Sequence, residues 1–425
     1  MRTFNDGTGT PRVDFAARAV IARARVGEPT YDIVTVGGGL GGASLAMAMA
    51  ARGARVLVGE RERRFADRVR GEALAPWGIE SARALGIGDL LTTDVGHELR
   101  WFDIFFAGSQ VNRRDVPATT PQGVGWLAFF HPAAQERVIE AAARAGATVR
   151  RGVRVRDVRP GSPSTIVVES ASGVEEITAR LVVAADGRRS VARKWGGFAT
   201  RRDTERHLFS GVLFEDHAAP PDASAIFFHP GGRIALCFPQ GDGRVRAYVG
   251  FNKDADPPRT SEYTVERFIV EAVRTGVPKE WYDGARQAGP LAIFDATDDW
   301  VDHPYANGVA LVGDAAATSD PTWGQGMSLA LRDARTLSEC LVGDDDWERA
   351  GHAYAAEHDR YAEIVRRADG WLSDLFMTVG PDADARRTRA LPRIAEDPTR
   401  FVDVGMSGPD IGIDETTRRR FFGED

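Results

Sequence analysis

Cysteine is scarce in this chain, histidine shows no metal-binding pattern, and no long apolar run occurs. The only cysteines are Cys237 and Cys340, which excludes a disulfide scaffold and a Cys-x-x-Cys zinc site. The eight histidines show no H-x-x-x-H or H-E-x-x-H spacing, so a bound metal is not expected. No segment reaches the roughly 18 consecutive apolar residues that a membrane span needs. Residues 1–29 lack the apolar core of a secretory signal and predict a solvated arm or short helix, so the expected location is cytoplasmic.

The sequence also lacks an excess of positive charge. Its 425 residues contain 54 basic and 61 acidic side chains, which gives a formal net charge of −7. A nucleic-acid partner held by phosphate neutralisation is therefore disfavoured. Hydrophobic residues make up 43% of the chain, which is typical of globular proteins, and this length predicts two or three domains.

A glycine-rich turn lies between a predicted strand and a predicted helix. Residues 31–36 form a short apolar strand, residues 37–42 the turn, and residues 43–52 a helix of small side chains. A second strand at 54–58 leads to Glu60. This order of strand, turn, helix and strand is the first unit of a parallel sheet.

The turn has the Gly-x-Gly-x-x-Gly spacing of a dinucleotide-binding fingerprint. The triplet alone is weak evidence in a chain with 46 glycines, but the flanking strand and helix support it. Gly37 permits the tight turn, Gly39 lets a pyrophosphate approach the backbone, and Gly42 lets the helix pack on the strand. The free N–H groups at the start of the helix would hold the phosphates. Glu60 would accept hydrogen bonds from the hydroxyls of an adenosine ribose without a 2′-phosphate.

A second unit of this kind lies far along the chain. Gly308-Val-Ala-Leu-Val-Gly-Asp-Ala-Ala316 is a predicted strand that delivers Asp314 to its C-terminal end. The segment Asp320-Pro-Thr-Trp-Gly-Gln-Gly-Met327 follows, and residues 328–341 predict a long helix.

With these motifs the chain resembles the class A flavoprotein monooxygenases, the para-hydroxybenzoate hydroxylase-like family. The resemblance covers about residues 31 to 342 and rests on three motifs in the family's order: Gly37–Gly42 with Glu60, the Asp-Gly motif Ala185-Asp-Gly-Arg-Arg-Ser-Val-Ala-Arg193, and the Gly-Asp motif Gly313-Asp314 with Pro321 and Gly324-Gln-Gly326. It implies bound FAD. It also implies NADH or NADPH as a transient donor, because no second glycine fingerprint follows a strand.

The resemblance also implies roles for the later motifs. Asp314 would bind a ribityl hydroxyl of FAD, and the helix after Gly326 would direct its N–H groups at the flavin pyrimidine ring. Glycine at positions 324 and 326 would leave room for the isoalloxazine. Asp186 and Gly187 would lie near the pyrophosphate and the route of the nicotinamide donor, with a plain turn as the alternative.

Two more residues stand where the family places cofactor contacts. Arg70 matches an arginine that touches the cofactor, although a solvated surface arginine is the alternative. His131 opens a helix predicted at 131–146, where the family often has Arg or Gln near the FAD phosphates. No residue is singled out as a catalytic base. The predicted cofactor-binding set is Gly37, Gly39, Leu40, Gly42, Glu60, Arg61, Arg70, His131, Asp186, Gly187, Gly313, Asp314, Pro321, Gly324, Gln325, Gly326 and Met327.

The sequence departs from the family at Ala317, where members often have histidine. This difference bears on subfamily placement more than on cofactor binding. None of the nine tryptophans is followed two positions later by another, so the Trp-x-Trp-x-Ile-Pro signature of the related flavin-dependent halogenases is absent. Halogenation is therefore disfavoured.

The predicted fold is α/β: a Rossmann-like FAD-binding domain with an inserted antiparallel-sheet substrate domain and C-terminal helices. The FAD-binding domain is expected at 30–100, 125–205 and 290–345, the substrate domain at 101–124 and 206–289, and the C-terminal helical region at 346–425. Alternation with a period of two between about 206 and 295 predicts an antiparallel meander with one covered face. In the last region a helix is expected at 346–377, with a core-packing stripe of Trp347, Tyr354, Tyr361, Ala368 and Leu375.

The expected activity is an FAD-dependent monooxygenase reaction. NAD(P)H and O2 would be used to hydroxylate or epoxidise a small organic substrate through a flavin C4a-hydroperoxide, as the resemblance implies. An apolar or aromatic substrate is favoured by aromatic residues near the domain borders, although core packing is their commoner fate: Trp101, Phe102, Phe105, Phe106, Trp126, Phe129 and Phe130. The alternatives are an FAD-dependent reductase or dehydrogenase of the same fold, similar to geranylgeranyl reductase, and a flavin-holding protein without turnover.

Overall fold

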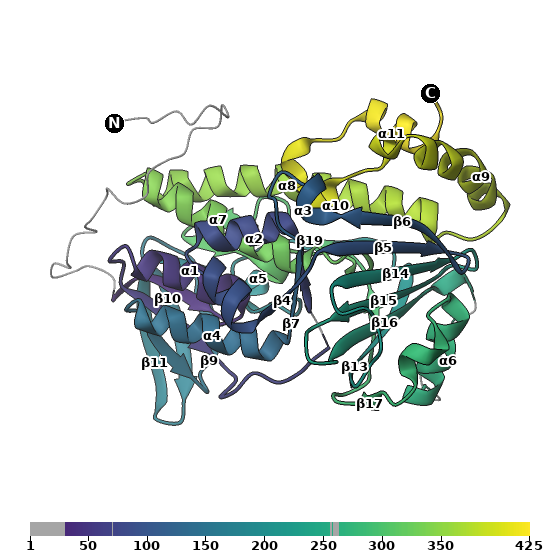
Figure 1. Ribbon diagram of the computed structural model, residues 1–425. Helices are drawn as coiled ribbons and strands as arrows, with labels where there is room; N and C mark the ends of the chain where they lie inside the picture. The colour runs from purple at the N-terminus through teal and green to yellow at the C-terminus, as the bar shows by residue number, and fades with distance from the viewer. Residues whose placement is uncertain (1–29, 70, 256, 258–262) are drawn as a thin grey trace.

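The computed structural model describes residues 30–69, 71–255, 257 and 263–425. Two sheets lie side by side, the long helix α8 runs across both, and the last helices of the chain lie over the second sheet (Figure 1). The predicted arm at 1–29 and Arg70 lie outside the described residues. The predicted α/β fold is confirmed.

The first sheet has five parallel strands in the order β21, β11, β1, β2, β8. Their bounds are Tyr31–Val36 for β1, Val56–Glu60 for β2, Thr148–Arg151 for β8, Gly173–Ala184 for β11 and Val309–Leu311 for β21. Val36 pairs with Gly59 on one side and with Ala184 on the other. Because the strands are parallel and in this register, the turns that follow them meet at one edge of the sheet.

Helices cover one face of this sheet, and two antiparallel strands, which belong to the same sheet because one of them pairs with the first half of β11, pack over the other face. The helices are α1 (Leu40–Ala50), α4 (His131–Arg144) and α7 (Gly326–Gly343), and the strands are β9 (Arg154–Arg159) and β10 (Ser164–Ser170). The predictions for β1, α4 and α7 are confirmed to within two residues. The first helix begins at Leu40, three residues earlier than predicted, because Gly41 and Gly42 are helical.

The second sheet is mostly antiparallel, in the order β17, β13, β16, β15, β14, β5, β6, with β18 beside β13. Its main strands are β5 (Trp101–Phe106), β6 (Ser109–Asp115), β13 (His207–Glu215), β14 (Ala223–His229), β15 (Arg233–Pro239), β16 (Val245–Asn252) and β18 (Ala292–Ala296). The domain limits predicted from the sequence remain a proposal. In the structure both faces of this sheet are covered.

The prediction of one covered face was wrong for a physical reason. The outer face packs against α6 (Val265–Thr275), as the alternation of β16 predicts. The inner face carries Tyr248 and neighbouring aromatics and packs against α8 and the C-terminal helices. A period of two describes which side chains share a face, and it cannot tell whether a distant helix covers the other one.

A small sheet of β3 (Ala73–Leu74), β7 (Trp126–Phe129) and β4 (Gly96–Leu99), with α2 (Pro76–Ala84), joins the two larger sheets. Helix α8 (Trp347–Phe376) follows α7, and α9 (Pro381–Glu396), α10 (Val404–Ser407) and α11 (Glu415–Phe422) complete the chain. All five residues of the predicted stripe on α8 are buried, which confirms their packing role. In the described part of the chain, no helix combines the length and apolarity of a membrane span.

Candidate functional site

One cavity of about 1060 Å3 extends from the edge of the first sheet to the inner face of the second. Its first part, the polar arm, is lined by the turns after β1, β2, β11 and β21. Its second part, the aromatic chamber, is lined by Phe102, Trp126, Phe209, Phe228, Phe238, Tyr248, Phe294, Trp323, Leu372, Phe376, Phe401 and Met406. The sequence motifs and the aromatic sheet face therefore belong to a single site.

The three glycines of the fingerprint have different surroundings. Gly37 has a φ of +106°, and a Cβ there would lie 2.4 Å from the carbonyl oxygen of Ala185. A Cβ on Gly42 would lie 2.3 Å from the oxygen of Gly37, which explains the close packing of helix and turn. A Cβ on Gly39 would meet only the Gln135 Nε2 atom, at 3.5 Å, among the described atoms, and Gly39 lines the cavity. The bare backbone at Gly39 therefore leaves space for a ligand at the start of α1.

Glu60 lies buried at the end of β2 and lines the polar arm. Its Oε2 atom accepts a hydrogen bond of 2.8 Å from the backbone N–H of Gly38, and Oε1 accepts one of 2.8 Å from the N–H of Glu62. These bonds fix the carboxylate, while each oxygen keeps a lone pair for a ligand hydroxyl. Arg61 also lines the cavity, and its exposed guanidinium pairs with Glu62 at 3.3 Å.

The Asp-Gly motif has a structural role of its own. Asp186 Oδ2 accepts hydrogen bonds from the N–H groups of Val191 and Ala192 at the start of a short helix. Its Oδ1 atom is buried and has no hydrogen-bond partner among the described residues. Gly187 has a φ of +81°, and no described atom lies within 4 Å of an added Cβ. Both residues line the polar arm, so the turn also leaves a buried acceptor and an open backbone for a ligand.

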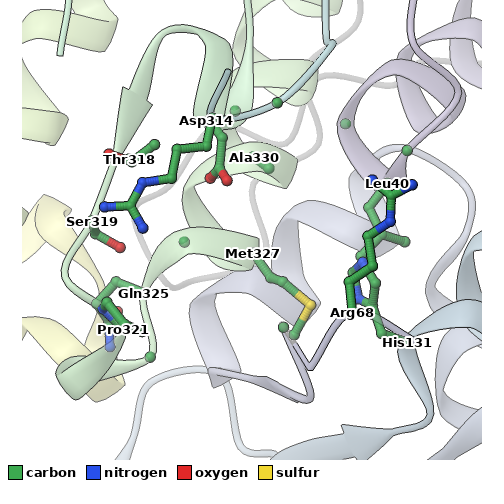
Figure 2. Close-up of a pocket in the computed structure, with 18 of the residues that line it drawn as sticks. Leu40, Arg68, His131, Asp314, Thr318, Ser319, Pro321, Gln325, Met327 and Ala330 are labelled. Atoms are coloured by element: carbon green, nitrogen blue, oxygen red, sulfur yellow. The ribbon is translucent and has the colours of Figure 1, made fainter. Parts of the chain in front are cut away.

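Two helices hold the turn that presents Asp314. The N–H of Gly313 donates a hydrogen bond of 2.7 Å to Asp333 Oδ2 on α7. Asp333 Oδ1 accepts further bonds from His358 and Tyr361 on α8, and this network is buried. Asp314 lies across the pocket from Leu40, Arg68 and His131, with Met327 between them (Figure 2).

The loop before α7 is fixed by polar contacts. Asp320 accepts hydrogen bonds from the backbone N–H of Thr322 and from His207 Nδ1, the latter at 2.6 Å. Gly324 is left-handed, with a φ of +69°. Gln325 uses its side chain within the protein, since Oε1 accepts from Trp77 and Nε2 donates to the carbonyl of Trp323. Pro321, Gly324, Gln325, Gly326 and Met327 all line the cavity. Within the described residues, no side chain caps the N-terminus of α7, so its positive end is available to a ligand.

His131 lies at the start of α4 and faces the cavity beside Gly71 and Met327. Burial lowers its pKa to about 4, so the imidazole is neutral at pH 7. Its Nδ1 atom has no hydrogen-bond partner among the described residues. Arg70 falls outside the described residues, while Arg68 lines the cavity and forms an ion pair of 2.5 Å with Glu62.

A buried ionic group beside the cavity could not be predicted from the sequence. Arg246 on β16 is fully buried and contacts Asp67 at 2.8 Å and Glu72 at 3.1 Å. Gln240 Nε2 donates to Glu72 Oε2 at 2.7 Å. Burial raises the pKa of Glu72 to about 7, and the Arg246 charge and the Gln240 hydrogen bond offset part of that effect. Glu72 lines the cavity, so it is a titratable group next to the ligand space.

The aromatic residues singled out in the sequence divide between chamber and core. Phe102 and Trp126 line the chamber. Phe129 is buried in the core of the first sheet, and Phe105 stacks on Phe227 at 4.4 Å on the other face of the second sheet. The C-terminal segment adds Phe401, Val402 and Met406 to the chamber wall, which no motif in the tail indicated.

The residues present in the polar arm fit FAD. Gly39, Gly187 and Gly326 offer backbone faces that a side chain would otherwise occupy, because added Cβ atoms there meet no described atom closer than 3.5 Å. Asp186 Oδ1, His131 Nδ1 and Ser319 Oγ are buried polar atoms without partners among the described residues, and all three residues line the cavity. An elongated polar ligand with an aromatic end would satisfy these groups and extend toward the chamber.

Comparisons with known proteins agree with this geometry. The family model described as FAD binding domain matches residues 30–369. Aklavinone 12-hydroxylase DnrF of Streptomyces peucetius subsp. caesius is 30% identical over 371 residues, covering 80% of this chain and 73% of that protein. Digeranylgeranylglycerophospholipid reductase 2 of Methanopyrus kandleri is 28% identical over 341 residues, covering 74% and 78%. The crystal structure of p-nitrophenol 4-monooxygenase PnpA from Pseudomonas putida shares the fold, with a TM-score of 0.74, 20% identity, and coverage of 88% of this chain and 96% of that one.

Proposed function

We propose, because the chain belongs to the FAD binding domain family, that its cavity holds FAD in the polar arm and oxygenates a small apolar or aromatic substrate in the aromatic chamber. The chain is an FAD-dependent oxidoreductase of the monooxygenase type. One observation carries the finer proposal: the polar arm and the chamber are one continuous cavity. A substrate in the chamber would therefore lie beside the cofactor without solvent between them.

Residues of the polar arm would bind and orient the cofactor. The N–H groups at the start of α1, exposed at Gly39, would hold the phosphates, and Glu60 would accept hydrogen bonds from the adenosine ribose. Asp314 would bind a ribityl hydroxyl. The uncapped start of α7 would place its positive end at the ring that gains negative charge on reduction. When bound, FAD supplies the electron transfer and the activation of O2.

Residues of the chamber would hold the substrate and exclude water. Apolar rings cover most of its wall, and Trp126 is fixed by a hydrogen bond of 2.8 Å from its Nε1 to Met406 Sδ. His131 lines the cavity, remains neutral at pH 7 and so adds no positive charge to the cavity wall. NADH or NADPH would bind transiently, since the sequence has one dinucleotide fingerprint.

The test is oxygen-dependent turnover by the FAD-loaded protein. NADH and NADPH oxidation, O2 uptake and hydrogen peroxide would be measured with a panel of phenols, naphthols and polycyclic ketones. We expect some members of the panel to stimulate NAD(P)H oxidation, with one atom from labelled O2 found in the product. Stimulation with peroxide as the sole oxygen product, or no stimulation at all, would argue against this substrate class.

An oxygen-independent reduction at the same cavity is the second candidate. The similarity to a digeranylgeranylglycerophospholipid reductase over 74% of this chain favours it. An isoprenoid chain is apolar enough for the chamber wall. Anaerobic consumption of NAD(P)H with geranylgeraniol, and formation of its saturated product, would support the reductase reaction. Strict dependence of NAD(P)H consumption on O2 would support the monooxygenase reaction instead.

A further inference from the structure

Asp369 is a carboxyl group in the wall of an otherwise mainly apolar chamber. It lies on α8 with Leu372 and Phe376, which follow at helical spacing and also line the cavity. Asp369 is 4% exposed, and its Oδ2 atom is buried without a hydrogen-bond partner among the described residues. No hydrogen bond or ion pair joins its side chain to another described residue. A buried carboxylate without a partner is strongly unfavourable, so this position needs either a proton or a ligand.

The groups around Asp369 favour the protonated form. Burial raises its pKa well above the ordinary value, and the carboxylates of Asp298 and Asp320 raise it further. Asp320 keeps its charge, because hydrogen bonds from His207 and Thr322 lower its pKa despite burial. Asp298 has its own pKa raised to about 7, first by burial and then by Asp320, and the charge of Arg366 offsets only part of this. Burial and two neighbouring carboxylates therefore favour the neutral, protonated form of Asp369.

The neighbouring polar group on this side of the chamber is already engaged. Trp323 Nε1 donates a hydrogen bond of 2.9 Å to Ser373 Oγ. The rings of Phe228 and Phe376 stack with their centroids 4.4 Å apart, and the ring centroids of Trp323 and Phe228 are 6.0 Å apart. The O–H of Asp369 is thus a hydrogen-bond donor, set among aromatic rings, that no described side chain or backbone group uses.

We propose that Asp369 is a specificity-determining residue whose carboxylic acid donates a hydrogen bond to a neutral carbonyl or hydroxyl oxygen of an aromatic ligand in the chamber. The ionised carboxylate of Asp320, and that of Asp298 in so far as it is ionised at pH 7, would repel a ligand carboxylate. The chamber would therefore select neutral aromatic ketones and phenols over aromatic acids. The inference rests on the proposed function, because it assumes that the chamber holds the substrate.

Binding of a matched set of ligands tests this role without turnover. The probes are 9-fluorenone, fluorene and fluorene-9-carboxylate, which share one ring system and differ in a ketone, no oxygen and an anion. Their affinities for the FAD-loaded protein would be measured at pH 7 by quenching of tryptophan fluorescence. Because fluorenone would gain one hydrogen bond from Asp369 to its ketone oxygen, it should bind about tenfold more tightly than fluorene. The carboxylate should bind more weakly than either.

Two variants assign the preference to Asp369. Asp369→Leu removes the donor and should bring fluorenone and fluorene to equal affinity. Asp369→Asn keeps an N–H donor and should retain the preference. At high pH the wild-type preference should decline as Asp369 loses its proton, whereas that of Asp369→Asn should not. A preference that survives in Asp369→Leu would overturn the proposal, and so would wild-type protein that binds all three probes equally or binds none.

Thermal melting separates a ligand-binding role from a structural one. Asp369→Leu should melt at a higher temperature than the wild type, because an apolar side chain replaces a buried carboxyl group without partners. Such a gain in stability is expected where the natural residue serves function. A fall in the melting temperature of both variants would show that Asp369 supports the fold and would contradict the proposal. Failure of the proposed function is distinguishable, because it would appear as absent oxygen-dependent turnover while the fluorenone preference remained.

Discussion

Asp333 on α7 accepts a 2.7 Å hydrogen bond from the backbone N–H of Gly313, the residue immediately before Asp314. The same carboxylate accepts bonds from His358 and Tyr361 on α8, and Asp333 is 1% exposed. The position of Asp314 in the polar arm therefore depends on two helices that lie behind the turn.

Loss of the Asp333 carboxylate should weaken both the fold and the cofactor site. Asp333→Ala leaves the Gly313 N–H, His358 and Tyr361 without their acceptor, at an expected cost of about 3 kcal/mol of unfolding free energy. Tyr361→Phe removes one donor and should cost about 1 kcal/mol. Urea unfolding and the flavin absorbance of the purified protein would measure the two effects. Asp94→Ala, at an exposed position, is the control and should change neither.

Asp314 itself should affect cofactor binding more than folding. Asp314→Ala is expected to purify with little or no yellow colour and to bind added FAD at least about tenfold more weakly, as the loss of a charge-assisted hydrogen bond predicts. Titration of the apoprotein with FAD gives the affinity, and circular dichroism checks the fold. A normally yellow, active variant would remove Asp314 from the site.

Alanine substitutions at two fingerprint glycines should distinguish a role in ligand binding from a role in packing. Gly39→Ala should fold with unchanged stability, because the added Cβ meets only Gln135 Nε2 at 3.5 Å, yet it should bind FAD at least about tenfold more weakly. Gly42→Ala places its Cβ 2.3 Å from the Gly37 oxygen and should lose about 1–3 kcal/mol of stability. Apoprotein melting and FAD titration would compare them. Gly370→Ala on α8, with no described atom within 4 Å, should stabilise the protein by up to about 1 kcal/mol.

Glu72 should give the protein a pH-dependent stability. Its pKa rises from 4.5 to about 7 on folding, so the folded protein keeps a proton that the unfolded chain loses between these values. Its contribution to the free energy of unfolding is complete below pH 4.5 and is lost as the pH rises through 7. In this window the free energy of unfolding should fall by up to about 1.4 kcal/mol per pH unit. Glu72→Gln should flatten the unfolding free energy in this window. An unchanged slope in Glu72→Gln, or an equal flattening in the exposed control Glu280→Gln, would contradict this assignment.

The polar arm could be predicted from the sequence because its residues act locally. Gly37 and Gly42 stand between a strand and a helix whose patterns are continuous in the chain, and the position of Glu60 follows from the next strand. The parallel sheet then brings the distant turn at Asp314 to the same edge, and the family motif supplied that link.

The chamber could not be predicted to the same extent because its wall depends on packing between distant segments. The alternation of β16 puts Arg246 on the face opposite Val245 and Ala247, and only the structure shows that its side chain is buried against Asp67 and Glu72. Asp369 can be noticed in the sequence, because it is an acidic residue within an apolar helical pattern that includes Val365 and Leu372. The sequence alone does not indicate which groups surround a single acidic residue in such a stripe.

Two sides of the polar arm come from distant parts of the family-matched region, one from residues 37–62 and the other from residues 313–327. FAD bound between them would stabilise the native state, because the denatured chain has no such site to bind it. At a thousandfold excess over Kd this linkage is worth about 4 kcal/mol. Cellular flavin supply would then govern how long the protein survives heat and proteases, as well as how fast it turns over.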